Sequence, residues 1–218
     1  MLGDLCDRGP RSRQAIESAA WLVRSFPGSA LVRGNHDDLL LRATASGAGR
    51  RDVGIWLARG GGATLESYRP GDPEGALDAI SSDILGHRTF LEGSTFSLRD
   101  GGLLFAHAGI DPSKGPSEQG DRDLLWARDG FLDHVGSLGA VVVHGHSVVG
   151  DLPVVTENRI SLDTGAFSSG RLTAAAFDAS AAEVRFLQTA GRASRVERVD
   201  PVRLDRGYGV ATDALYAG

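Results

Sequence analysis

The chain has 218 residues, of which 41% are hydrophobic and 23% are charged, and its formal net charge is −5. This length and composition suit a globular protein with one substantial core, and the negative charge disfavours nucleic acid or an anionic membrane as the main partner. Cys6 is the single cysteine, which excludes an intrachain disulfide. With no signal peptide and no apolar run long enough to span a membrane, we expect a cytoplasmic protein.

Residues 3–10, Gly-Asp-Leu-Cys-Asp-Arg-Gly-Pro, form the first polar segment. Leu2 is predicted to end a strand, and loops at the carboxyl ends of strands are where α/β proteins bind their ligands. Asp4 could hold a metal ion, and Asp7 with Arg8 could serve a bound anion. The sequence therefore predicts a ligand-binding loop at this place.

A strand, a polar loop and a helix follow in the same order. Ser12 is predicted to cap a helix that ends near Phe26. Residues 30–32 form a short apolar run typical of a buried parallel strand, and Gly-Asn-His-Asp at 34–37 separates this run from a leucine-rich helix at 38–45. The second polar loop thus repeats the layout of the first.

Residues 46–92 are predicted to be helical and irregular, an insertion or lid that carries no obvious chemistry. Three consecutive glycines at 60–62 predict a flexible break. Helices are expected at 52–59, 63–68, 75–85 and 87–91.

From Ser94 the periodicity becomes that of strands. A hairpin is predicted around Asp100-Gly101, and its second strand ends at His107. Residues 140–143 form a buried strand that ends at the sequence His-Gly-His of 144–146. Further strands are expected at 154–157, 159–162, 172–178 and 183–187.

Four predicted strands therefore end in polar residues: Asp4 with Asp7 and Arg8, Asn35 with His36, His107, and His144 with His146. Strand ends gather along one edge of a sheet, and carboxylate, amide and imidazole groups suit borderline metals such as Mn, Fe, Co or Zn. Each cluster alone could be a turn, a helix cap or a hydrogen-bonded structural histidine. Their conjunction, in this order, favours a metal site.

These motifs resemble those of the calcineurin-like metallophosphoesterases. The resemblance is closest to the bacterial phosphoprotein (serine/threonine) phosphatase branch and covers nearly all of residues 2–187. It rests on Gly-Asp-x-x-Asp-Arg-Gly at 3–9, Gly-Asn-His-Asp at 34–37, His-Ala-Gly at 107–109 and Gly-His at 145–146. Lesser signatures are Trp-Ala-Arg at 126–128, Trp56-Leu57 followed by Gly60-Gly61, and residues 160–165.

The resemblance implies a metallophosphoesterase fold of mixed α/β type, a four-layer α/β/β/α sandwich with two mixed sheets. The expected organisation is a metallophosphatase domain at 1–190, with a helical insertion at about 46–92, and a C-terminal tail at 191–218.

The resemblance also implies a metal centre. Asp4 would bridge two divalent ions, with Mn the foremost expectation and Fe, Zn, Co or Ni the alternatives. Asn35, His107 and His146 would complete the ligand shell of one of these ions.

The same resemblance implies how a phosphoester would be cleaved. Asn35, Arg8 and Arg128 would bind the substrate phosphate, because amide and guanidinium groups match its oxygens. His36 would be the general acid for the leaving alkoxide, held and oriented by Asp7. The nucleophile would be a metal-bound hydroxide that attacks phosphorus in line.

One family motif is absent from this sequence. Relatives carry an Asp-x-His-Gly segment, on a strand followed by a helix, upstream of the motif found here at 3–9. We therefore expect that the N-terminal strand and helix are missing and that the ligand set is full for only one ion. Either Met1 is an internal methionine or a late start, or the chain is a short protein with impaired catalysis. His87 and His134 do not match the absent motif and are expected at the surface.

The foremost expectation for function is metal-dependent hydrolysis of phosphoserine and phosphothreonine in proteins. The alternatives are a dinucleoside polyphosphate hydrolase or another small-molecule phosphoesterase, and a truncated form that binds phosphate without catalysis. The expected partner is a phosphoprotein or other phosphoester substrate, with no nucleic acid and no membrane. We expect no redox role for Cys6.

Overall fold

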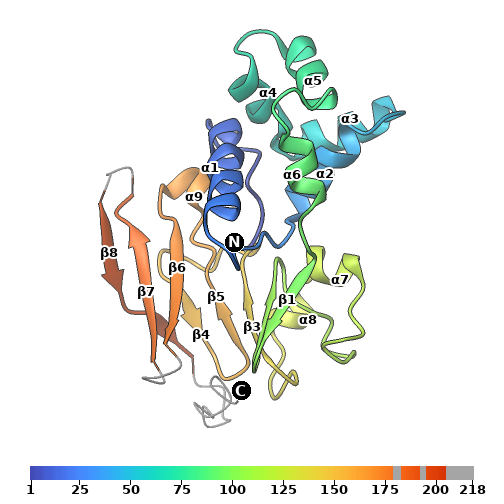
Figure 1. Ribbon diagram of the computed structural model, residues 1–218. Helices are drawn as coiled ribbons and strands as arrows, with labels where there is room; N and C mark the ends of the chain where they lie inside the picture. The colour runs from blue at the N-terminus through green and yellow to red at the C-terminus, as the bar shows by residue number, and fades with distance from the viewer. Residues whose placement is uncertain (179–182, 192–194, 205–218) are drawn as a thin grey trace. The chain divides into compact units, whose positions relative to one another are not determined.

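The computed structural model describes residues 1–178, 183–191 and 195–204. The chain divides into two compact units, an N-terminal unit of residues 1–95 and a C-terminal unit of residues 96–218 (Figure 1). The N-terminal unit is helical, and the C-terminal unit contains two β-sheets. The predicted mixed α/β fold with two sheets is confirmed, although the smaller sheet is antiparallel throughout rather than mixed.

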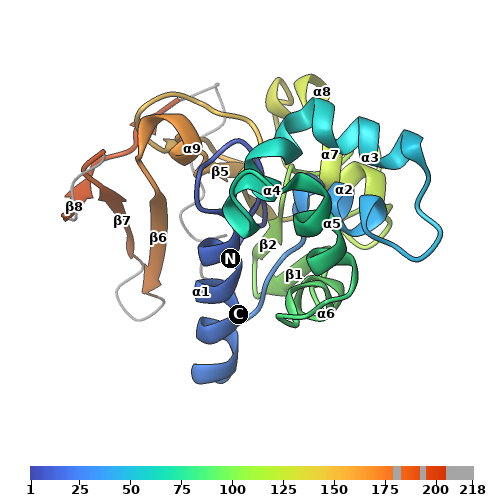
Figure 2. The ribbon, with the colours of Figure 1, turned by 90° about the horizontal axis from the view of Figure 1, so that it is seen from above.

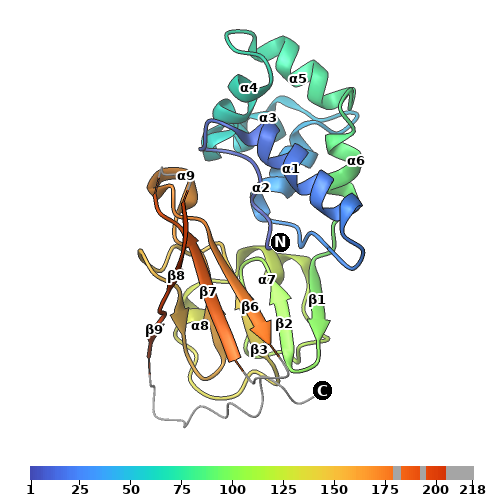
Figure 3. The same cartoon turned by 60° about the vertical axis from the view of Figure 1, so that its left-hand side comes forward.

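Six α-helices build the N-terminal unit, and a π-helical turn joins the third to the fourth (Figures 2 and 3). Their bounds are α1 (Ser12–Ser25), α2 (Asn35–Ala43), α3 (Arg50–Trp56), η1 (Leu57–Gly61), α4 (Gly62–Tyr68), α5 (Pro73–Ser81) and α6 (His87–Glu92). Every α-helix contributes a side chain to one buried apolar cluster, in chain order Ile16, Leu40, Trp56, Leu65, Ile80 and Leu91. This shared core holds the unit together, because burial of apolar surface is the main stabilising term.

Helix α2 begins earlier than predicted, at Asn35 rather than at residue 38. The Asp37 side chain accepts a hydrogen bond from the Gly34 backbone N–H at 2.9 Å, which closes the N-terminal end of the helix. Residues 35–37 of the second polar motif therefore form the first helical turn instead of a loop before it.

Three other local predictions need correction. Ser12 is the first residue of α1 and not its cap, because its hydroxyl accepts a hydrogen bond from the Asp7 N–H at 3.1 Å. His87 is buried, with 6% of its surface exposed, since its ring lies beside Tyr68 with Tyr68 Oη 2.5 Å from His87 Nδ1. The predicted strand at residues 30–32 is reduced to a single bridge between Val32 and Thr95.

The larger sheet of the C-terminal unit has six strands in the order β1-β2-β3-β5-β4-β9. The neighbours of β3 are both parallel to it, whereas β1 pairs with β2 and β4 pairs with β5 antiparallel. The strands are β1 (Ser97–Asp100), β2 (Leu103–Ala106), β3 (Val141–His144), β4 (Val154–Val155), β5 (Arg159–Ser161) and β9 (Val202–Arg203). The antiparallel sheet contains β6 (Thr173–Asp178), β7 (Glu183–Thr189) and β8 (Val196–Val199).

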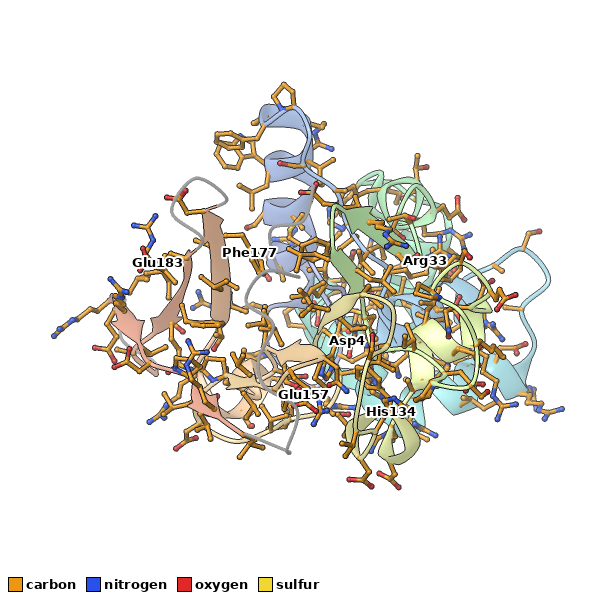
Figure 4. The ribbon with its side chains drawn as sticks, turned by 90° about the horizontal axis from the view of Figure 1, so that it is seen from below. Asp4, Arg33, His134, Glu157, Phe177 and Glu183 are labelled. Atoms are coloured by element: carbon orange, nitrogen blue, oxygen red, sulfur yellow. The ribbon has the colours of Figure 1, made fainter. Side chains whose placement is uncertain are left out.

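The two faces of the larger sheet have different neighbours, because successive side chains of a strand point to opposite sides. Leu104 and Val142 pack against Leu124 of α7 (Asp121–Trp126) and Phe131 of α8 (Asp129–Leu132). On the other face, Phe105 meets Phe177 of β6 edge to face, with ring centroids 6.0 Å apart (Figure 4). Within this unit the layers are therefore helices, larger sheet and smaller sheet. A short helix α9 (Ala166–Ser169) links β5 to β6.

Strands β8 and β9 fall inside the range expected to be a C-terminal tail, residues 191–218. Strand β8 pairs with β7 along Val196–Val199, and its alternating exposed and half-buried positions explain why its apolar pattern is weak. The rest of that range, residues 205–218, lies outside the described residues. Within the described part of the chain, no helix combines the length and the apolar character needed to cross a membrane.

Candidate functional site

The first polar loop has an unusual backbone. Three of its non-glycine residues have positive φ angles, 55° at Asp4, 75° at Asp7 and 61° at Arg8, and Gly3 has a φ of 80°. The left-handed region costs an L-residue about 1–2 kcal/mol, so this conformation persists only where the surroundings fix it. The fixing groups come from the second polar motif and from the segment between α3 and α4.

Asp37 provides the first of these groups. Its fully buried carboxylate accepts the backbone N–H groups of Asp4 at 2.9 Å and of Leu5 at 3.0 Å, in addition to that of Gly34. The Cys6 thiol also lies 3.7 Å from the same carboxylate. One side chain therefore ties the left-handed loop to the start of α2.

Two glycines allow the loops to approach this closely. A Cβ atom on Gly3 would lie 2.2 Å from the Gly34 nitrogen, and one on Gly34 would lie 2.2 Å from the Asp4 nitrogen. Because the backbones are in contact, the Asp4 side chain accepts a hydrogen bond from the His36 N–H at 3.0 Å. Asn35 is buried beside them, with 1% of its surface exposed.

His36 lies between two charged residues of the loop. Its Nδ1 is 2.7 Å from Asp7 Oδ2, and its Nε2 is 2.6 Å from Arg8 Nη2. A guanidinium can only donate, so Nε2 is the acceptor and the ring hydrogen is on Nδ1, where it is donated to Asp7. The imidazole is thus oriented at both nitrogens. Asp7 and His36 are buried, whereas Arg8 is exposed.

Asp7 has two further partners that the sequence did not reveal. Trp56 Nε1 and the Thr64 hydroxyl donate to Asp7 Oδ1 at 2.9 Å and 2.7 Å, and both side chains are completely buried. Both lie in residues 46–92, where no chemistry was predicted. Trp56 stands in one of the lesser family signatures, which gave it no role at the site, and the Thr64 hydroxyl stands in no recognisable pattern.

Cys6 is held inside this loop as a thiol. Burial raises its pKa well above the ordinary value, and the carboxylates of Asp7, Asp37 and Asp4 raise it further. The thiolate is the reactive form of cysteine, so this arrangement supports the expectation that Cys6 has no redox role.

The C-terminal unit places His107 and His146 together. Their ring centroids are 5.1 Å apart, and the Gly145 N–H donates to the His107 carbonyl at 2.8 Å, which joins the two strand ends. His146 has a φ of 63°, and the Trp126 ring lies at its edge with centroids 6.0 Å apart. The two imidazoles predicted as metal ligands are therefore neighbours within one unit.

His144 has a structural role. Its Nδ1 lies 3.0 Å from the Gly145 carbonyl and its Nε2 lies 2.7 Å from the Ser161 hydroxyl, so the neutral ring donates at Nδ1 and accepts at Nε2. Complete burial lowers the pKa of His144 to about 3. The Phe131 ring packs against it with centroids 4.9 Å apart.

The remaining predicted residue, Arg128, is exposed where α8 begins. The predicted residues are thus divided between the units. Those of the N-terminal unit that lie together are Asp4, Asp7, Arg8, Asn35 and His36, and those of the C-terminal unit are His107, His146 and Arg128. The carboxylate, amide and imidazole donors present are those that borderline divalent metals accept.

Comparisons with known proteins agree with these features. Residues 1–165 match the family model described as calcineurin-like phosphoesterase. The chain is 28% identical, over 190 residues, to a bis(5'-nucleosyl)-tetraphosphatase PrpE [asymmetrical] of Anoxybacillus flavithermus, covering 79% of this chain and 72% of that protein. The crystal structure of a metallophosphoesterase from Sphaerobacter thermophilus is similar with a TM-score of 0.42 and 18% identity, covering 92% of this chain and 76% of that one.

Proposed function

The chain belongs to the calcineurin-like phosphoesterase family, whose members hydrolyse phosphoesters with divalent metal ions, and we propose that its substrate is a dinucleoside tetraphosphate. The observation that carries this substrate is the similarity to a bis(5'-nucleosyl)-tetraphosphatase over most of both chains. The sequence motifs alone ranked a protein phosphatase first, and this relative supports the alternative, a dinucleoside polyphosphate hydrolase.

The proposed metal ligands are Asp4, Asn35, His107 and His146, a donor set that suits one borderline divalent ion, Mn foremost. Bound ions would neutralise charge on the phosphate and supply an activated water. Two of these residues belong to the N-terminal unit and two to the C-terminal unit.

The N-terminal unit supplies the proposed acid and one of the proposed phosphate clamps. His36, oriented by Asp7, would donate a proton to the leaving oxygen, and Arg8 would bind the phosphate together with Asn35 and Arg128. In this structure Arg8 donates a hydrogen bond to His36 Nε2. Arg8 must therefore leave His36 and bind the phosphate before His36 Nε2 can carry the proton that it donates.

A phosphoprotein is the second candidate substrate. The observation that favours it is the buried Asp7–His36 pair, because an alkoxide leaving from phosphoserine needs a proton far more than a nucleotide phosphate does. A general acid that Asp7 holds in place at Nδ1 suits this harder reaction.

The two substrates can be compared in one experiment. The wild-type protein is assayed with added Mn²⁺ on diadenosine tetraphosphate and on a phosphoserine peptide, and we expect a higher kcat/KM on the dinucleotide. Faster turnover of the peptide would reverse the substrate assignment, and no turnover of either would favour the form that binds phosphate without catalysis.

Substitution of the acid gives the second part of that experiment. His36→Asn is expected to lower turnover of the peptide by about 100-fold or more and turnover of the dinucleotide by less. His134→Asn, the same exchange at a position outside the proposed machinery, should change neither. Equal losses on both substrates would contradict the general-acid role.

A further inference from the structure

Asp7 divides its two carboxylate oxygens between different partners. Oδ2 faces His36 Nδ1 at 2.7 Å, whereas Oδ1 accepts from Trp56 Nε1 at 2.9 Å and from the Thr64 hydroxyl at 2.7 Å. Two donors on one oxygen fix the plane of the carboxylate, and the other oxygen is left to the imidazole.

Thr64 also contacts the backbone of the same residue. Its hydroxyl accepts the Asp7 N–H at 2.9 Å and lies 3.1 Å from the Ser12 hydroxyl, which accepts the same N–H. Thr64 therefore supports both the left-handed backbone of Asp7 and its side chain.

The π-helical turn η1 brings these donors to the loop. The Gly60 carbonyl accepts the Arg8 N–H at 3.2 Å, and a Cβ on Gly60 would lie 2.8 Å from Arg8 Cγ. A Cβ on Gly61 would lie 2.5 Å from the Trp56 ring, so a glycine is needed for the indole to lie across the turn.

We infer that residues 56–64 are a positioning element for the Asp7–His36 pair, with Trp56 and Thr64 as positioning residues that act through Asp7. This inference rests on the proposed function, because it assigns the pair to proton donation. The buried carboxylate needs these donors in any case, since an unpaired buried charge is costly. Their placement on Oδ1 alone is what orients Oδ2 toward the imidazole.

The kinetic test compares Thr64→Val, which keeps the side-chain shape and removes the hydroxyl, with Thr64→Ser, which keeps the hydroxyl. Wild type and variants are assayed on 4-nitrophenyl phosphate and on phenyl phosphate, whose leaving group is poorer. We expect Thr64→Val to lose about 100-fold in kcat on phenyl phosphate, less on 4-nitrophenyl phosphate, and little in KM, and Thr64→Ser to restore kcat.

Thr44→Val is the matched control, because Thr44 is a buried threonine of the same unit whose hydroxyl donates to the Leu40 carbonyl within α2. It should leave the leaving-group dependence unchanged. If Thr64→Val fails to fold, Trp56→Phe removes the other donor to Oδ1 and is expected to show the same leaving-group dependence.

A measurement without turnover separates this inference from the proposed function. In the free protein, the His36 Nδ1 proton should give a downfield NMR resonance that His36→Asn removes. We expect Thr64→Val to broaden or shift this resonance and Thr44→Val to leave it in place. A wild-type protein without activity but with this pattern would overturn only the proposed function. An unchanged resonance together with unchanged leaving-group dependence in Thr64→Val would overturn the positioning role.

Discussion

Asp37 explains how the left-handed loop of residues 3–8 is maintained. The loop has three non-glycine residues with positive φ angles, and the Asp37 carboxylate accepts three backbone N–H groups around it. Each oxygen has its own donors, because Oδ2 faces the N–H groups of Asp4 and Gly34 and Oδ1 faces that of Leu5. No uncharged side chain of this shape offers two acceptor oxygens.

Asp37→Asn should therefore destabilise the protein more than its small change in shape suggests. In either orientation its NH₂ group would face a backbone N–H, and we expect a loss of about 2–3 kcal/mol in the free energy of unfolding, measured by urea denaturation. Asp52→Asn is the control, since Asp52 occupies the same position in α3 but accepts a single, exposed N–H from Gly49, at 3.1 Å. It should cost less than about 1 kcal/mol. Equal losses would contradict the role given to Asp37.

Among single residues, the sequence predicts the polar ones that stand close together in a motif. Asp7, Arg8, Asn35 and His36 could be predicted because polar residues gather where apolar runs end. The partner His36 of Asp7 was among the predictions, but Thr64 was not, because it reaches Asp7 across 57 positions of the chain and its hydroxyl resembles any other in a helix.

The three consecutive glycines at 60–62 predict a break between two helices, and the helical geometry is interrupted there. Gly60 in η1 has a φ of 109°, outside the helical region, so that the chain kinks between α3 and α4. Glycine permits flexibility, but it also permits positive φ angles and close backbone approach, and the sequence alone does not distinguish these uses. The hairpin of β1 and β2 was predictable, because its turn and its apolar second strand are local features.

Neighbouring glycines of this turn should respond differently to alanine. Gly60→Ala introduces a Cβ at a positive φ and 2.8 Å from Arg8 Cγ, so we expect a loss of about 1–3 kcal/mol in the free energy of unfolding together with lower activity. Gly62→Ala places a methyl group in open space at a helical φ of −57°, where alanine is favoured by up to about 1 kcal/mol. Thermal denaturation of both variants is the measurement. If Gly60→Ala has the same melting temperature as the wild type, the turn adjusts to the added methyl group and the prediction is wrong.

For the whole molecule, the division into two units assigns the proposed metal ligands to different parts of the chain. Asp4 and Asn35 belong to the N-terminal unit, and His107 and His146 belong to the C-terminal unit. A single domain at 1–190 was expected from the sequence, although the periodicity changes to that of strands at Ser94, next to the boundary between the units.

The proposed metal ion should stabilise the folded wild-type protein. At a Mn²⁺ concentration of about 100 times Kd, we expect the melting temperature to rise by about 5–10 °C. Asp4→Asn and His146→Gln should each abolish this rise, and His134→Gln should leave it intact. Calorimetry with and without Mn²⁺ is the measurement. A rise that survives in either variant would contradict the proposed ligand set.

The contacts of the first polar loop also have a consequence for the order of folding. The groups that fix Asp4, Asp7 and Arg8 belong to residues 34–37 and 60–64, which are distant in sequence. Contacts between distant residues form late, since the intervening chain must first be ordered. The loop with the proposed reactive groups therefore completes its structure only after α2 and α4 have docked, and it is among the first parts to lose that structure when either helix loosens.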